Sequence, residues 1–208
     1  MDHCCEEKAH EIESSRHAFG RVLVIVLYIN SIMFAAEFGA GLIARSTALL
    51  ADSLDMFGDA TVYGLSLYAL HKPERWRAGA ALAKGLLMFG FAMFLLGEVT
   101  LKFFAGVVPD APLMGTFGLL ALAANLACAA LLSRFRAGEI NMRSTWLCSR
   151  NDVLANLGVL LAGGLVALTQ SRWPDVAIGL AIAGVFLHSS FAVFRAAWAR
   201  FALAAARP

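Results

Sequence analysis

Charged residues are scarce in this sequence. Only 15% of its 208 residues are Asp, Glu, Lys or Arg, whereas 60% are hydrophobic. A typical soluble domain has about a quarter of its residues charged, so the composition nearly excludes a water-soluble protein. The net charge is only +2, because 17 basic residues nearly balance 15 acidic ones. This balance argues against nucleic-acid binding through bulk positive charge.

A disulfide framework is lacking as well. Cys4 and Cys5 are adjacent near the N-terminus, while Cys128 and Cys148 lie inside apolar stretches. This spacing does not suggest paired cysteines, so we expect four free thiols. The head of the chain is acidic, which is the wrong charge for the first part of a signal peptide, and we therefore expect the first apolar run to be retained.

Long apolar runs make up most of the chain. Each crossing of a bilayer needs about 20 apolar residues, and six runs meet this length: 20–44, 47–70, 78–101, 112–133, 145–168 and 175–197. The connections between them are too short to form a domain. The sequence therefore predicts an all-α integral membrane protein with six transmembrane helices over 20–197, an N-terminal tail over 1–19 and a short tail over 198–208.

The basic residues predict the orientation of these spans, because positively charged loops stay in the cytoplasm. Three of them, Arg45, Lys102 and Arg172, fall at one face of the membrane. Twelve fall at the other: Lys8, Arg16, Arg21, Lys72, Arg75, Arg77, Arg134, Arg136, Arg143, Arg195, Arg200 and Arg207. We therefore expect both termini to be cytoplasmic.

Acidic residues interrupt the second span. Asp52, Asp55 and Asp59 are spaced three and then four apart, which places the three carboxylates on one helical face. Each would cost about 2.5–3.5 kcal/mol near the middle of a membrane helix. Like charges this close also repel, and in a low dielectric they demand a cation or protons. This pattern favours a functional role, although Asp52 alone could instead serve helix packing or hydrogen bonding.

The fifth span supplies a matching pair, Cys148 and Asp152, one turn apart on a common face. If the second and fifth spans pack antiparallel, these two residues can meet Asp55 and Asp59 near the middle of the bilayer. Three carboxylates and one thiolate form a tetrahedral set that suits Zn²⁺ or a softer ion such as Cd²⁺. Taken alone, Cys148 could be a small buried apolar residue, and we expect that role for Cys128.

Further acidic and sulfur-bearing residues could assist such an ion. Glu37 lies in the first span and Glu98 in the third, where each could attract cations, although Glu98 fits better at the membrane interface. His3, Cys4 and Cys5 at the N-terminus could collect metal from the cytosol. The alternative for these three residues is a tail whose thiols have no such role.

Three segments together resemble cation diffusion facilitators. Residues 46–59, which end in the Asp55 and Asp59 pair, resemble the second transmembrane helix of that family, where a His or Asp precedes an Asp by four. The segment from Asn141 through Cys148, Asp152 and Gly158 resembles the family's fifth helix with its His-x-x-x-Asp pair, and residues 173–175 resemble the start of its sixth. The similarity runs over roughly residues 20–195.

This resemblance implies a transporter, not an enzyme, that exports Zn²⁺, Cd²⁺, Co²⁺ or a similar divalent ion in exchange for protons. The family's metal-binding positions map onto Asp55, Asp59, Cys148 and Asp152, with Cys148 in place of the family's His. No resident cofactor is implied. The family's cytoplasmic C-terminal domain is absent from the sequence, so a homodimer would have to form through the membrane helices. The expected location is a bacterial inner membrane.

Two other functions compete with transport. Intramembrane aspartyl proteases also use paired carboxylates, but they need one Asp on each of two helices, whereas here a closely spaced triplet and a thiol occur. A passive metal channel or a membrane metal sensor would use the same residues without proton coupling. A metal exporter explains the whole pattern best.

Overall fold

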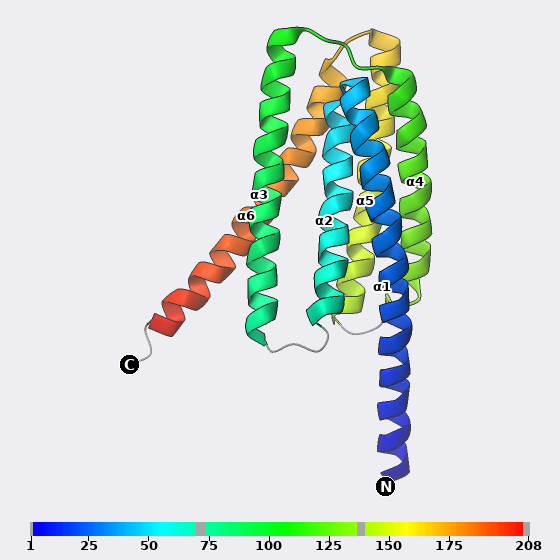
Figure 1. Ribbon diagram of the computed structural model, residues 1–208, viewed down its shortest axis with the longest axis vertical. Helices are drawn as coiled ribbons and strands as arrows, with labels where there is room; N and C mark the ends of the chain where they lie inside the picture. Colours follow the sequence, from blue (N-terminus) through cyan, green and yellow to red (C-terminus); the bar gives the residue numbers. More distant parts are fainter. Residues whose placement is uncertain (1, 70–73, 137–139, 206–208) are drawn as a thin grey trace.

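The protein is a bundle of long helices, seen in a computed structural model (Figure 1). The structure describes the backbone of residues 2–69, 74–136 and 140–205. It describes the side chains of residues 18–65, 67, 85–136, 146, 149 and 151–195.

Six α-helices and no strand form the described part of the chain, which confirms the all-α prediction. The helices are α1 (Asp2–Ala44), α2 (Thr47–Ala69), α3 (Glu74–Ala105), α4 (Ala111–Ser133), α5 (Ile140–Thr169) and α6 (Trp173–Ala205). Each predicted span corresponds to one helix. The first and last helices extend well beyond their spans, since the flanking residues include many strong helix formers such as Ala, Glu, Lys and Arg.

Five helices contain a stretch long and apolar enough to cross a membrane, and within the described residues α2 is not one of them. The difference has a simple cause, because Asp52, Asp55 and Asp59 interrupt its apolar sequence. Yet α2 lies inside the bundle, with neighbours on several sides (Figure 1). The helix whose apolar sequence is interrupted by three acids is therefore one that the other helices surround.

Both termini lie at one end of the bundle, and the α1–α2, α3–α4 and α5–α6 connections lie at the other (Figure 1). We call the latter the connection end. The tightest pairs are α1 with α2, α4 with α5, and α3 with α6. The helices α2 and α5 contact each other and run in opposite directions (Figure 1), as the metal-site hypothesis requires.

A tight turn joins α1 to α2 at the connection end. Arg45 has a φ of 51°, and its N–H donates to the carbonyl of Leu42 at 3.3 Å. The N–H of Ser46 donates to the carbonyl of Gly41 at 3.0 Å. This pair of bonds is a Schellman motif, which ends a helix sharply. Ser46 then caps α2 by accepting a bond from the N–H of Leu49 at 3.1 Å, so α2 turns back along α1.

One buried carboxylate, Asp175 at the start of α6, binds the beginning of α2. Its oxygens accept hydrogen bonds from the hydroxyl of Ser46 at 2.5 Å and from the N–H groups of Thr47 at 2.9 Å and Ala48 at 3.0 Å. It also pairs with the ammonium of Lys102 on α3 at 2.5 Å, and both side chains are buried. Because the N-terminus of a helix attracts negative charge, Asp175 ties α2, α3 and α6 together at the connection end.

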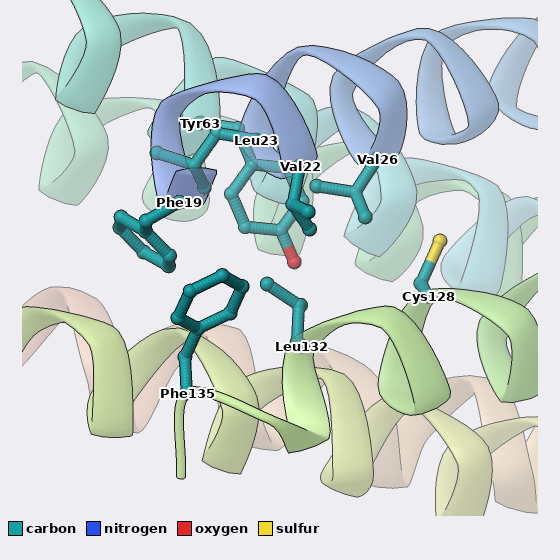
Figure 2. Close-up of a cluster of buried hydrophobic side chains, with 8 residues drawn as sticks. All are labelled: Phe19, Val22, Leu23, Val26, Tyr63, Cys128, Leu132 and Phe135. Atoms are coloured by element: carbon teal, nitrogen blue, oxygen red, sulfur yellow. The ribbon is translucent and has the colours of Figure 1, made fainter. Parts of the chain in front are cut away.

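An apolar cluster fills the bundle nearer the termini (Figure 2). It consists of Phe19, Val22, Leu23, Val26, Tyr63, Cys128, Leu132 and Phe135. The rings of Phe19 and Phe135 meet edge to face with centroids 5.2 Å apart, a favourable aromatic geometry. Cys128 is buried here, which confirms its predicted packing role.

Phenylalanine rings link α1, α2, α3 and α6 on another side of the bundle. Phe57 on α2 lies 4.8 Å from Phe34 and 5.9 Å from Phe91, measured between ring centroids, and Phe91 lies 5.9 Å from Phe186. Such contacts bury large apolar surfaces and exclude water. The aromatic side of α2 therefore lies against α1 and α3.

Candidate metal site

The acidic face of α2 points into the protein. Asp52 is 1% exposed and Asp59 is 6% exposed, while Asp55 between them is half-buried. Phe57 lies roughly opposite on the helix, because each residue turns the helix by about 100°. The prediction that the three carboxylates share one face is thus consistent with their burial, and α2 separates an acidic side from an aromatic one.

The end of this acidic face nearest the connection end is bound to α5 through a chain of amides. The side-chain N–H₂ group of Asn156 donates to both carboxylate oxygens of Asp52, each at 2.8 Å. The side-chain oxygen of Asn156 in turn accepts a longer bond from Asn125 on α4 at 3.4 Å. All three side chains are buried. The hydrogen-bonding role considered for Asp52 is therefore present in the structure.

The other end of the acidic face contacts the apolar cluster of Figure 2. The phenolic hydroxyl of Tyr63, one turn further along α2, donates to Asp59 at 2.6 Å. The thiol of Cys128 accepts a weak bond from Asn30 on α1 at 3.8 Å. Asp59 is therefore oriented by a donor on its own helix, Tyr63, which itself belongs to the apolar cluster.

The fifth helix supplies the remaining candidates. Asp152 is half-buried on α5, one turn before Asn156. Cys148 lies one turn earlier still, and its side chain is outside the described residues. Among the side chains that the structure describes, no three His, Cys, Asp or Glu residues are grouped to hold one ion. The predicted set of Asp55, Asp59, Cys148 and Asp152 includes the thiol of Cys148, which lies outside the described residues. The four-ligand site therefore stays a prediction.

The further candidates occupy different surroundings. Glu37 on α1 is fully buried, whereas Glu98 on α3 is half-buried. Both carboxylate oxygens of Glu37 are buried and accept no hydrogen bond within the described part of the chain. The side chains of His3, Cys4 and Cys5, in the first turns of α1, lie outside the described residues.

Sequence reasoning assigned no role to several residues that shape this region. Asn125 and Asn156 interrupt apolar spans, and this interruption was the available signal that they form buried hydrogen bonds. The clamp between Asp175 and Lys102 joins residues that are 73 positions apart, and no local pattern indicates it.

Comparison with known proteins agrees with this architecture. Residues 23–200 match the family model described as the cation efflux transmembrane domain. Two relatives, the "Metal cation efflux system protein CzcD" of Cupriavidus metallidurans and the "Cation efflux system protein CzcD" of an Alcaligenes species, are each 26% identical over 174 residues. The alignment covers 78% of this chain and 55% of each relative, so the chain spans about half their length.

The family match covers most of the chain, including α2, α5 and every candidate residue except those of the N-terminal head. It confirms the predicted family, a multi-pass location in the membrane and a transporter in place of an enzyme. The chain belongs to the cation efflux family of integral membrane transporters.

Proposed function

We propose that this protein exports a divalent transition-metal ion from the cytoplasm in exchange for protons. The observation that carries the proposal is the buried acidic face of α2 inside a cation efflux domain. Buried carboxylates are costly in a membrane unless a cation or protons compensate them. The curated relatives are described as metal cation efflux and cation efflux system proteins, which supports the same class of cargo.

The proposed ligands are Asp55, Asp59, Cys148 and Asp152. The antiparallel contact of α2 with α5 supports this set, since it lets residues from both helices approach at one level. The bond from Asn156 to Asp52 supports it further by fixing that contact one turn away from Asp55 and Asp152. A thiolate among carboxylates favours Zn²⁺ and softer ions over Mg²⁺ or Ca²⁺.

Proton exchange follows from the chemistry of these ligands. Metal binds their deprotonated forms, so protons arriving from the far side compete for the same atoms and release the ion. The empty site returns protonated, because a cluster of bare carboxylates is too costly in a low dielectric. In this proposal both termini face the cytoplasm, as the positions of the basic residues predict, and the connection end faces outward.

The proposal includes a homodimer in a bacterial inner membrane. Large apolar side chains on the outer faces of the helices, among them Ile43, Phe104 and Leu168 at 76–82% exposure, suit contact with lipid or with a second copy. Cross-linking in native membranes, with the monomer as the contradicting result, tests the dimer.

Transport into sealed vesicles tests the function itself. Purified protein is reconstituted into proteoliposomes with a pH-sensitive dye inside, and Zn²⁺, Cd²⁺ and Co²⁺ are added outside in turn. We expect metal uptake together with proton movement in the opposite direction. Metal flux without proton movement would support a passive channel, and binding without flux would support a sensor.

A further inference from the structure

Tyr63 carries a hydroxyl group into the apolar cluster of Figure 2. Its side chain is 2% exposed, and the other members of the cluster are apolar side chains and the buried thiol of Cys128. A phenylalanine ring would fill nearly the same space, so packing alone does not account for the hydroxyl. Buried hydroxyl groups in native proteins have hydrogen-bond partners, and the partner of this one links the cluster to the acidic face of α2.

That partner is Asp59, whose Oδ2 atom accepts the hydrogen bond from the Tyr63 hydroxyl at 2.6 Å. Tyr63 follows Asp59 by one helical turn, and side chains in an α-helix lean toward its N-terminus, so the phenol reaches back along α2 to the carboxylate. Hydroxyl bonds to ionised carboxylates have lengths of about 2.5–2.7 Å and are roughly twice as strong as bonds between neutral groups. Because the ring is packed inside the cluster, the donor stays in place beside Asp59.

The two ends of the acidic face are held in different ways. Asn156 donates to both carboxylate oxygens of Asp52, whereas Tyr63 donates to Oδ2 of Asp59. A metal ion that bound Asp52 would compete with its amide donor at either oxygen. A metal ion can bind Asp59 through Oδ1 while the phenol keeps its bond to Oδ2. This difference supports Asp59, and not Asp52, as a metal ligand.

We propose that Tyr63 is a positioning residue that makes Asp59 bind the exported ion through one oxygen only, and that it thereby helps to select the metal. This inference rests on the proposed export function and on Asp59 as a ligand. If both oxygens of Asp59 bound the ion, the Tyr63 hydroxyl would lose or weaken its bond inside an apolar cluster. Leaving a buried donor without its acceptor is costly, so the cluster opposes two-oxygen binding.

The number of ligand atoms determines which ions the site prefers. Three carboxylates that each bind through one oxygen, together with one thiolate, supply four ligands, which is the number that Zn²⁺ takes in most protein sites. Mn²⁺ instead prefers six oxygen ligands in an octahedral arrangement. A carboxylate able to bind through both oxygens would enlarge the shell toward that arrangement. Tyr63 therefore favours Zn²⁺ over Mn²⁺ without touching the ion.

Visible absorption of bound Co²⁺ in the purified protein tests this inference, because tetrahedral Co²⁺ absorbs far more strongly than five- or six-coordinate Co²⁺. The unmodified protein should give the intense spectrum. Tyr63→Phe keeps the ring and removes the hydroxyl, so Asp59 can bind through both oxygens and the absorption should fall severalfold. The ratio of Zn²⁺ to Mn²⁺ affinity should fall by about tenfold or more, the scale of loss when a group that orients a metal ligand is removed.

Tyr28→Phe is the matched control, because Tyr28 on α1 is 64% exposed and lies outside the cluster. It should keep both the intense spectrum and the affinity ratio of the unmodified protein. The inference is overturned if Tyr63→Phe keeps them as well, or if it binds Zn²⁺ and Mn²⁺ more weakly by the same factor with an unchanged spectrum, which is the result of a merely structural role. Weak absorption by the unmodified protein would contradict the four-ligand site itself and the inference with it, whereas a failure confined to Tyr63→Phe leaves the export function standing.

Discussion

The side-chain amide nitrogen of Asn156 lies 2.8 Å from each carboxylate oxygen of Asp52. This contact joins α5 to α2 between residues 104 positions apart in the chain. It limits how far one helix can shift along the other, and therefore helps to set the levels at which Asp55 and Asp152 lie along the bundle. The register of the proposed metal site depends on a bond that lies beside the site itself.

Replacing Asn156 should destabilise the protein more than replacing Asn125. Asn156→Ala leaves the buried Asp52 without its donor, and a lost bond to a charged group costs about 1.5–3 kcal/mol. Asn125→Ala removes only the longer contact at 3.4 Å and should cost less. Unfolding of the detergent-solubilised variants measures both free energies. Equal losses would contradict a specific role for Asn156.

The clamp at the connection end should behave as a buried ion pair. Asp175→Ala leaves Lys102 buried without its counter-ion and should cost about 3–5 kcal/mol of unfolding free energy. Asp110→Ala is the matched control, because Asp110 only caps α4 at an exposed position and its loss should cost about 1 kcal/mol. In Asp175→Ala, adding Lys102→Met should recover part of the stability. No recovery would show that the charge pairing is unimportant.

Gly179 allows α6 to approach the start of α2. A methyl group at this position would lie 2.6 Å from the Cγ2 atom of Thr47, which is far closer than normal contact. Gly179→Ala should therefore cost about 1–3 kcal/mol through overpacking. Gly184→Ala, where nothing lies within 4 Å, should instead be neutral or stabilise the helix by up to about 1 kcal/mol. Thermal unfolding of the two variants compares them, and similar midpoints would contradict the close packing.

The thiol of Cys148 should influence which metal is carried. Cys148→His replaces a soft ligand with a borderline one, so the ratio of Cd²⁺ to Zn²⁺ transport should fall. Cys128→Ala should leave that ratio unchanged, because the Cys128 thiol is buried in the apolar cluster of Figure 2. Transport of both ions in proteoliposomes gives the ratios. A change with Cys128→Ala and none with Cys148→His would reverse our assignment of the two thiols.

The sequence predicts much of the fold because membrane helices follow from local composition. Each apolar run corresponds to one helix, and the spacing of Asp52, Asp55 and Asp59 indicates a common face, on which Asp52 and Asp59 are buried and Asp55 is half-buried. The apolar run over 47–70 predicted α2 as well, although its three acids leave no window with two or fewer charged residues.

Contacts between distant residues could not be predicted in the same way. The bonds of Asp175 to the start of α2 and of Asn156 to Asp52 depend on how the helices rotate and shift against one another. Helical periodicity gives the face on which a residue lies, but not the residue that it meets. The burial of Glu37 inside the bundle is a consequence of the same packing.

Transport by Asp59→Asn tests the central claim most directly. Asp59 is a buried carboxylate on α2 and a proposed ligand, and the amide removes its charge at nearly unchanged shape. Zn²⁺ uptake and internal pH are recorded together in proteoliposomes, with Asp110→Asn as the control. The account predicts that Asp59→Asn loses both metal uptake and proton movement, while Asp110→Asn keeps both. Zn²⁺ transport by Asp59→Asn at the rate of the unmodified protein would contradict it.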